Sequence, residues 1–314
     1  MKKALKAAGA VVLGALALLF VKNYVDSVRP WLPEDYDRDF RSDAPLEQRY
    51  AGRGAYRVSS LTERAADKAA DTLRVWYPET DTRAQPFPLV LVVNASNTAA
   101  RNYEPFFARL ASWGFVVAGN DDRQTGTGRS ASLMLDALLA LAETPSSPLC
   151  GRIDRDNIGI VGFSQGGAGA LRAATAYENS GAYKAIFTAS APYALLARNL
   201  GWGYDLSQLT APYLMTAGTG ASDDNGRRGA DEFSGVAPLF SLEENAAAMP
   251  EGVLRVRARA AGAEHSDMMQ RTDGYLTAWL LYLLHGDDQA AQVFTGDSPE
   301  LLHNPNWQDV SISP

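Results

Sequence analysis

Ser164 lies at the centre of a Gly-x-Ser-x-Gly pentapeptide, residues 162–166. A β-branched apolar run, residues 158–163, leads into it, and an alanine-rich segment of helical composition, residues 168–177, follows. A nucleophilic serine on a sharp strand-to-helix turn needs these glycines, because a Cβ would clash with the neighbouring backbone. Ordinary glycine-rich turns share the pentapeptide, but the flanking strand and helix favour a nucleophile. The pattern predicts acyl transfer, with the Gln165 amide as one donor to the oxyanion.

A serine near neutral pH is a weak nucleophile unless an imidazole accepts its proton and a carboxylate fixes the imidazole tautomer. The chain has three histidines, His265, His285 and His303. His265 follows the last expected strand, residues 253–260, and precedes a long apolar helix, so we predict that it is the base. His285 at a helix end and His303 near the C-terminus are interpreted as structural.

The acid is expected in the polar loop that follows the strand at residues 213–217. Asp223, Asp224 and Asp231 all lie there, and one of them is expected to act. Asp223 is favoured because it comes soonest after the strand, in a Gly-x-x-Asp pattern counted from Gly220. The order Ser, acid, His is the one expected of α/β-hydrolases. A second oxyanion donor is expected within residues 94–98, after the strand at 87–93.

Strands and helices alternate along the chain. This alternation predicts an α/β fold with a mostly parallel sheet, helices on both faces and no large cap domain. The expected strands are residues 56–60 and 72–77 at the edge, then 87–93, 115–118, 158–163, 183–189, 213–217 and 253–260. The expected helices are residues 103–113, 132–142, 168–177, 239–249 and 272–284. In such a sheet the site lies at the carboxyl ends of the strands.

The N-terminus carries Lys2, Lys3 and Lys6 ahead of an uncharged apolar run, residues 7–21. This pattern predicts that residues 1–25 are a signal anchor, or alternatively a cleaved signal peptide. Either would export the remainder, which would face outside the cytoplasm and be held at the membrane, or be secreted after cleavage. Residues 26–54 are expected to be a linker or an arm on the domain, residues 55–296 the catalytic domain, and residues 297–314 a tail.

The composition of the chain limits which kinds of ligand and partner it is expected to bind. The 314-residue chain has a formal net charge of −7 and a single cysteine. These values argue against nucleic-acid binding and exclude a disulfide within the chain. No cluster of His, Cys and Asp stands at metal-ligand spacing, so neither a metal nor an organic cofactor is expected.

Residues 87–294 resemble α/β-hydrolases of the dienelactone hydrolase, cutinase and bacterial polyester hydrolase group. The resemblance rests on three segments: Gly-Phe-Ser-Gln-Gly-Gly at 162–167, Leu-Ala-Ser-Trp-Gly-Phe-Val-Val at 110–117, and the C-terminal segment with Ala-Trp at 278–279 and Gly-Asp-Asp at 286–288. It implies that Ser164 is the nucleophile, His265 the base and Asp223 the acid. It also places Asn97 where these relatives carry an aromatic residue whose amide completes the oxyanion hole.

The chain departs from that group at two places. Ala-Ser-Asn at 95–97 replaces the usual His-Gly or Pro-Gly and the aromatic residue, which argues against substrates that need an aromatic clamp. The acid loop, residues 218–236, is longer than in polyester hydrolases. A serine in place of the cysteine of dienelactone hydrolases proper favours ordinary carboxylic esters.

Together these features predict a serine esterase that cleaves short-chain or otherwise accessible carboxylic esters, small or polymeric, through an acyl-enzyme. Residues 190–210 are too few for a large lid, and Tyr193, Trp202 and Tyr204 are candidates to line an open cleft. An acyltransferase or a peptidase would use the same triad. A non-catalytic binding protein on a hydrolase fold is the alternative from another class.

Overall fold

The computed structural model describes residues 29–80, 86–228 and 232–314. Within them nine strands form one sheet, in the order β1-β2-β4-β3-β5-β6-β7-β8-β9. Neighbours from β4 to β8 pair in parallel, whereas β1, β2 and β9 pair antiparallel. The strands are β1 (Val58–Arg64), β2 (Thr72–Pro78), β3 (Phe87–Val93), β4 (Val116–Asn120), β5 (Ile153–Phe163), β6 (Tyr183–Ala189), β7 (Tyr213–Gly218), β8 (Arg255–Ala260) and β9 (Trp307–Ser313).

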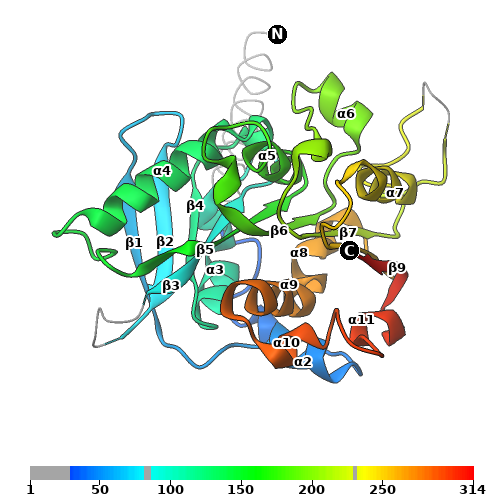
Figure 1. Ribbon diagram of the computed structural model, residues 1–314, viewed down its shortest axis with the longest axis horizontal. Coiled ribbons are helices and arrows are strands. Elements are labelled where there is room, and N and C mark those ends of the chain that lie inside the picture. Colours follow the sequence, from blue (N-terminus) through cyan, green and yellow to red (C-terminus); the bar gives the residue numbers. More distant parts are fainter. Residues whose placement is uncertain (1–28, 81–85, 229–231) are drawn as a thin grey trace, which may run out of the picture.

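Helices cover both faces of the sheet, as the sequence predicts (Figure 1). The main ones on one face are α4 (Arg129–Glu143), α5 (Gln165–Ala173) and α7 (Leu239–Ala248), and on the other α3 (Glu104–Ala111) and α9 (Asp273–Leu280). The shorter helices are α2 (Pro45–Ala51), α6 (Ala194–Asn199), α8 (Met268–Arg271), α10 (Asp288–Ala291) and α11 (Glu300–His303). The fold is therefore an α/β-hydrolase fold.

Strand β3 shows why the sheet needs helices on both of its faces. All seven of its residues are buried. Val90 and Val92 pack with α3 and α9, whereas Leu89, Leu91 and Val93 pack on the opposite face. Successive side chains of a strand point to opposite faces, so an uninterrupted apolar run has to be covered on both sides.

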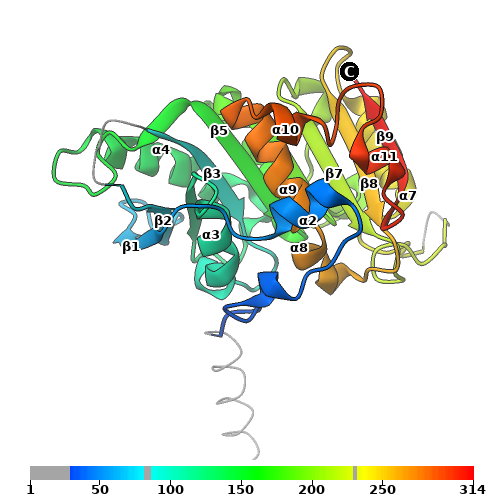
Figure 2. The ribbon, with the colours of Figure 1, turned by 90° about the horizontal axis from the view of Figure 1, so that it is seen from below.

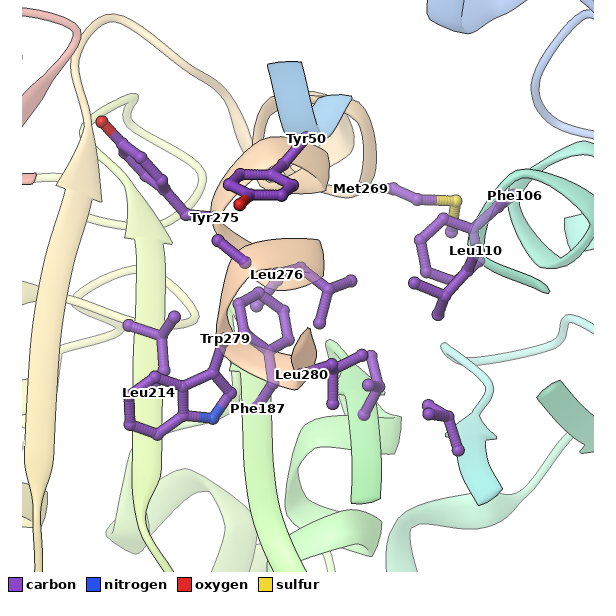
Figure 3. Packing of buried hydrophobic residues seen from close by; sticks show 14 of the residues in the cluster. Tyr50, Phe106, Leu110, Phe187, Leu214, Met269, Tyr275, Leu276, Trp279 and Leu280 are labelled. Atoms are coloured by element: carbon purple, nitrogen blue, oxygen red, sulfur yellow. The ribbon is translucent and has the colours of Figure 1, made fainter. Parts of the chain in front are cut away.

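Trp279 fixes α9 on the sheet (Figure 3). Its side chain is fully buried, its ring centroid lies 5.0 Å from that of Phe294, and its indole Nε1 donates to the carbonyl of Ile186 in β6 at 3.0 Å. Replacement of a buried tryptophan by alanine costs about 3–5 kcal/mol of stability. The bond to Ile186 additionally fixes the position of α9 along β6.

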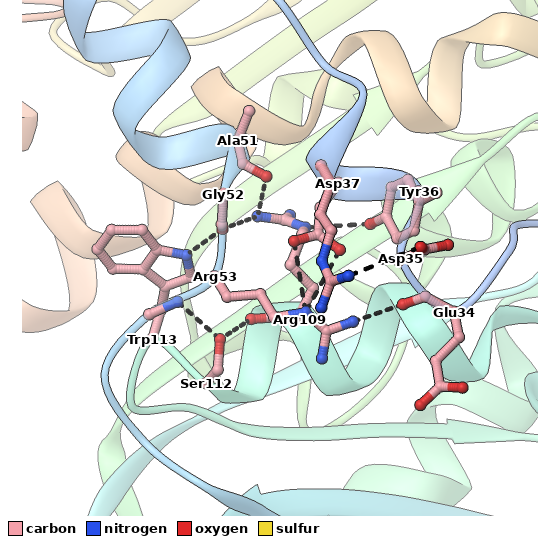
Figure 4. Close-up of polar contacts among 12 residues, drawn as sticks. Glu34, Asp35, Tyr36, Asp37, Ala51, Gly52, Arg53, Arg109, Ser112 and Trp113 are labelled. Atoms are coloured by element: carbon pink, nitrogen blue, oxygen red, sulfur yellow. Dashed lines mark hydrogen bonds and ion pairs between the residues drawn. The ribbon is translucent and has the colours of Figure 1, made fainter.

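The segment that precedes β1, residues 29–54, packs on the domain as an arm, and α2 lies against α9 (Figure 2). The side chain of Arg109 in α3 binds this arm (Figure 4). The fully buried guanidinium donates to the Asp273 carboxylate at 2.9 Å, the Tyr36 hydroxyl at 3.1 Å and the Tyr50 carbonyl at 3.1 Å. The ion pair with Asp273 joins α3 to α9, and loss of one partner from a buried ion pair costs about 3–5 kcal/mol. The bonds to Tyr36 and Tyr50 attach the arm to this buried pair.

The C-terminal segment corrects one expectation. Residues 297–314 are not a tail, because they contain α11 and β9, and β9 pairs antiparallel with β8. Residues 253–260 are accordingly not the last strand. Trp307 begins β9, is 5% exposed, and donates from Nε1 to Glu47 of α2 at 2.5 Å. This long-range contact with the arm is absent from local sequence patterns, which is why a tail was expected.

The expected membrane anchor, within residues 1–25, lies outside the described residues. Among the residues that the structure does describe, no helix has the length and apolar character needed to cross a membrane.

Candidate active site

Ser164 occupies the turn between β5 and α5. Its backbone has φ 53° and ψ −124°, a strained conformation for a residue with a Cβ. A Cβ on Gly162 would lie 2.2 Å from the carbonyl oxygen of Gly166, and one on Gly166 would lie 2.1 Å from that of Val93. Both glycines are therefore required for the close approach of β3, β5 and α5, as the motif predicts.

Ser164, His265 and Asp223 come together from three loops at the carboxyl ends of β5, β8 and β7. The Nε2 atom of His265 lies 2.9 Å from Oγ of Ser164, and its Nδ1 lies 2.6 Å from Oδ1 of Asp223. An imidazole that donates from Nδ1 to the carboxylate leaves Nε2 free to accept the serine proton. The arrangement has the geometry that nucleophilic acyl transfer requires.

The other two histidines lie elsewhere. Nε2 of His285 bonds to the Gly114 carbonyl at 3.1 Å, and its ring packs edge-to-face on Phe115. His303 is exposed at the end of α11. The structure brings neither of them to Ser164.

Asp223 is fully buried, and its second oxygen, Oδ2, has two further partners. The Ser190 hydroxyl donates to it at 2.5 Å and the Gly218 amide at 2.7 Å. Ser190, which no sequence pattern singled out, directly follows β6 and has φ 53°. The available signal was its position, because the residue after β6 must reach the same sheet edge as Ser164 and Asp223.

Asp224, one residue further along, has a different environment. Its Oδ2 accepts from Nη1 of Arg259 at 2.7 Å and from the Leu239 amide at 3.1 Å. Partial burial by itself would raise the pKa of Asp224. The bonds from the Leu239 and Gly226 amides and from Arg259 lower this pKa by more, so that it lies below its ordinary value. Asp224 therefore links its loop to β8 and α7 and does not contact His265. The third candidate, Asp231, lies outside the described residues.

Of the two backbone amides expected to donate to the oxyanion, one is free to do so in the structure and the other already has an acceptor. Gln165 directly follows Ser164 and is the first residue of α5. At this position the helix provides no acceptor for the Gln165 amide. The Asn97 amide instead donates to the Arg123 carbonyl at 3.1 Å, because φ of 59° turns this residue towards that loop. Asn97 is exposed and does not line the cleft beside Ser164. This arrangement contradicts the expectation, from the resemblance, that its amide faces the substrate.

Ser96, the residue before Asn97, lines that cleft. Its amide has no hydrogen-bond partner within the described part of the chain, whereas the preceding amide, of Ala95, donates to the Tyr103 hydroxyl at 2.8 Å. Tyr103 is fully buried, and its hydroxyl also bonds to Thr98 at 2.9 Å. The loop that follows β3 is thereby attached to the helical turn that precedes α3.

A cleft of about 480 Å³ lies over Ser164 and His265. Its walls are largely apolar and include Phe163, Met268 and Met269, together with Trp31 and Leu32 from the N-terminal arm. Within the described residues, no group of three or more His, Cys, Asp and Glu is arranged to hold a metal ion.

The three aromatic residues that we expected to line the cleft lie elsewhere. Tyr193 packs on Phe240, with ring centroids 5.8 Å apart. Trp202 lies against Gly126, and the Tyr204 hydroxyl donates to the Pro192 carbonyl at 3.0 Å. Residues 190–212 contain one short α-helix, α6, and one 3-10 turn, Leu206–Gln208, and form no large cap.

One comparison with known proteins bears on this geometry. A family model described as PET hydrolase-like matches residues 41–225, more than half of the chain. The matched span contains β1 to β7, Ser164 and Asp223, and it ends before His265.

Proposed function

Since the chain belongs to the PET hydrolase-like family of α/β-hydrolases, whose members are serine hydrolases acting on esters, we propose that Ser164, His265 and Asp223 are its catalytic triad. The observation that carries the proposal is the continuous set of hydrogen bonds from Oγ of Ser164 through His265 to the buried Asp223. This is the arrangement that activates a serine.

The geometry supports a two-step reaction. Oγ of Ser164 attacks the ester carbonyl carbon while Nε2 of His265 takes its proton, and the Gln165 and Ser96 amides stabilise the oxyanion. The tetrahedral intermediate then expels the alcohol, which receives that proton from His265, and the acyl group stays on Ser164. Water, deprotonated by His265, then attacks the acyl carbon. The second tetrahedral intermediate expels Oγ of Ser164, which receives that proton from His265, and the carboxylic acid leaves.

The substrate that fits is a short-chain or otherwise accessible carboxylic ester. The cleft is apolar, and the chain after β6 leaves it without a cap. Because no large cap covers it, the cleft shields a small acyl group next to Ser164 and leaves the far end of a long chain in water. In an acyl series from C2 to C16, measured with EDTA present, we expect the rate to peak at about C2 to C6. A maximum at C12 or longer, or an EDTA-dependent loss that added metal restores, would contradict this.

A fluorophosphonate probe tests the triad independently of the substrate, because it labels only an activated serine. We expect labelling of the wild type and of His303→Ala, and none of Ser164→Ala or His265→Ala. The Ser164→Ala variant should lose about 10³-fold or more in ester hydrolysis and keep its melting temperature. Hydrolysis within a few-fold of wild type would exclude Ser164 as the nucleophile.

Export through residues 7–21 belongs to the same proposal and rests on the basic start and the apolar run. Protease added to intact cells or to spheroplasts should degrade the catalytic domain. A domain protected in both preparations would exclude export, and a mature chain that begins beyond residue 21 would indicate cleavage instead of anchoring.

A further inference from the structure

Trp31 is brought to the catalytic cleft by the N-terminal arm, 133 positions away from Ser164 in the chain. Two hydrogen bonds hold the backbone of residues 29–31 against the turn that precedes α3. The Trp31 amide donates to the Asn102 carbonyl at 2.8 Å, and the Asn102 side-chain amide donates to the Arg29 carbonyl at 2.8 Å. The arm therefore has a defined position at the cleft.

The Trp31 ring is also held from one side. Its centroid lies 5.3 Å from that of Tyr103, at an interplanar angle of 45°. Tyr103 is itself fixed, because its ring packs on Phe107 and Phe163 and its hydroxyl bonds to the loop after β3. An aromatic side chain that is ordered before binding loses little conformational entropy when a ligand contacts it.

Despite this support, 49% of the Trp31 surface is exposed. Trp31 and Leu32 form one wall of the cleft that contains Ser164, and Met268 and Met269 contribute to the same lining. Exposed aromatic rings and thioether side chains both make favourable contacts with planar apolar groups. The exposed part of the ring is thus available to the part of a substrate next to its reacting carbonyl.

We propose that Trp31 determines specificity by contacting an aromatic ring carried by the ester substrate. The inference rests on the proposed function, because it assigns a binding role beside the same serine. The aromatic surface is supplied by the arm and not by the loop after β3, where the polar Asn97 faces away from the cleft. The chain should therefore favour esters of aromatic acids or aromatic alcohols over aliphatic esters of similar size.

The test compares esters that differ only in the ring, in the full-length protein. Vinyl benzoate and vinyl cyclohexanecarboxylate test the acyl side, and benzyl butyrate and cyclohexylmethyl butyrate test the alcohol side, so that each pair has rings of similar size and only one of the two rings is aromatic. On at least one side, Trp31→Ala should lower the ratio of kcat/KM for the aromatic ester to that for the aliphatic ester by about tenfold, the range expected for one stacking contact. Trp31→Phe should recover most of that ratio.

Two further variants complete the design. Phe233→Ala removes another exposed aromatic residue, one that does not line the cleft, and should leave both ratios unchanged. Trp31→Leu keeps apolar bulk without the large ring and serves where Trp31→Ala folds poorly. Ratios for Trp31→Ala and Trp31→Leu equal to those of the wild type on both sides would overturn the proposal. Failure of the proposed function looks different, since the wild type would then neither hydrolyse esters nor react with the fluorophosphonate.

Discussion

Asp223 and His265 are joined by a hydrogen bond of 2.6 Å between Oδ1 and Nδ1, although 42 positions separate them in the chain. The carboxylate is fully buried, and the Ser190 hydroxyl and the Gly218 amide also donate to it. Since each of these donors occupies a defined direction around the carboxylate, Asp223 can hold the imidazole in a single orientation and tautomer.

Asp223→Asn should therefore lower kcat by about 10⁴-fold, because an amide that donates to Nδ1 stabilises the wrong tautomer of His265. Steady-state kinetics with a short-chain ester provide the measurement. Asp224→Asn is the matched control, since it alters the neighbouring carboxylate that pairs with Arg259. It should lower the melting temperature and leave kcat within a few-fold of wild type. Equal losses of kcat in the two variants would contradict the assignment of the acid.

Ser190→Ala should lower kcat by about tenfold while KM changes little. The hydroxyl donates to the Asp223 carboxylate at 2.5 Å, and a hydrogen bond to a charged group contributes about 1.5–3 kcal/mol. Without it, the carboxylate keeps the Gly218 amide but is less firmly oriented towards His265. A variant with unchanged kcat and raised KM would show that Ser190 contacts substrate and does not orient the acid.

Tyr103→Phe should lower kcat by about tenfold through the loop that carries Ser96. Burial raises the pKa of Tyr103 to about 12, so its hydroxyl is neutral and accepts the Ala95 amide at 2.8 Å. Loss of this bond leaves the loop free to displace the Ser96 amide from the oxyanion.

Tyr183→Phe is the control for that variant. Tyr183 is equally buried, but its hydroxyl has no hydrogen-bond partner among the described residues. Its replacement should leave kcat unchanged. If both tyrosine variants retain wild-type kcat, then Tyr103 has only a structural role.

The stability of the fold should fall as the pH drops below about 6.5, and His285 contributes to this fall. Burial lowers the pKa of His285, although its hydrogen bond to the Gly114 carbonyl opposes the shift. As the pH falls, the His285 side chain therefore becomes protonated at a higher pH in the unfolded chain than in the folded one. Between the two pKa values the unfolded state holds more protons, so this contribution is fully present above about pH 6.5 and is lost as pH falls.

Melting temperatures measured from pH 7.5 down to pH 5 test this contribution. His285→Gln should flatten the curve, whereas replacement of the exposed His303 by Gln should leave the slope as in the wild type. Identical slopes for the two variants would show that His285 does not contribute.

Much of the fold was predictable because its signals are local. The apolar run of β3 is buried on both faces from end to end. The glycines around Ser164 are required by contacts within the turn itself and with the adjacent β3. The α/β-hydrolase fold and the family were accordingly apparent from the sequence. By contrast, β9 was missed because it is stabilised by pairing with β8 and by the bond from Trp307 to Glu47, both distant in the chain.

The sequence by itself determined which residue types stand at the carboxyl ends of the strands, because the positions of strands and loops along the chain follow from local hydrophobic patterns. Only the tertiary structure decided between Asp223 and Asp224, since adjacent side chains point in different directions and one reaches His265 while the other reaches Arg259. It likewise placed the Ser190 hydroxyl on the Asp223 carboxylate and Trp31 in the cleft. These contacts join segments far apart in the chain, and their geometry depends on how the arm, the sheet and the helices pack together.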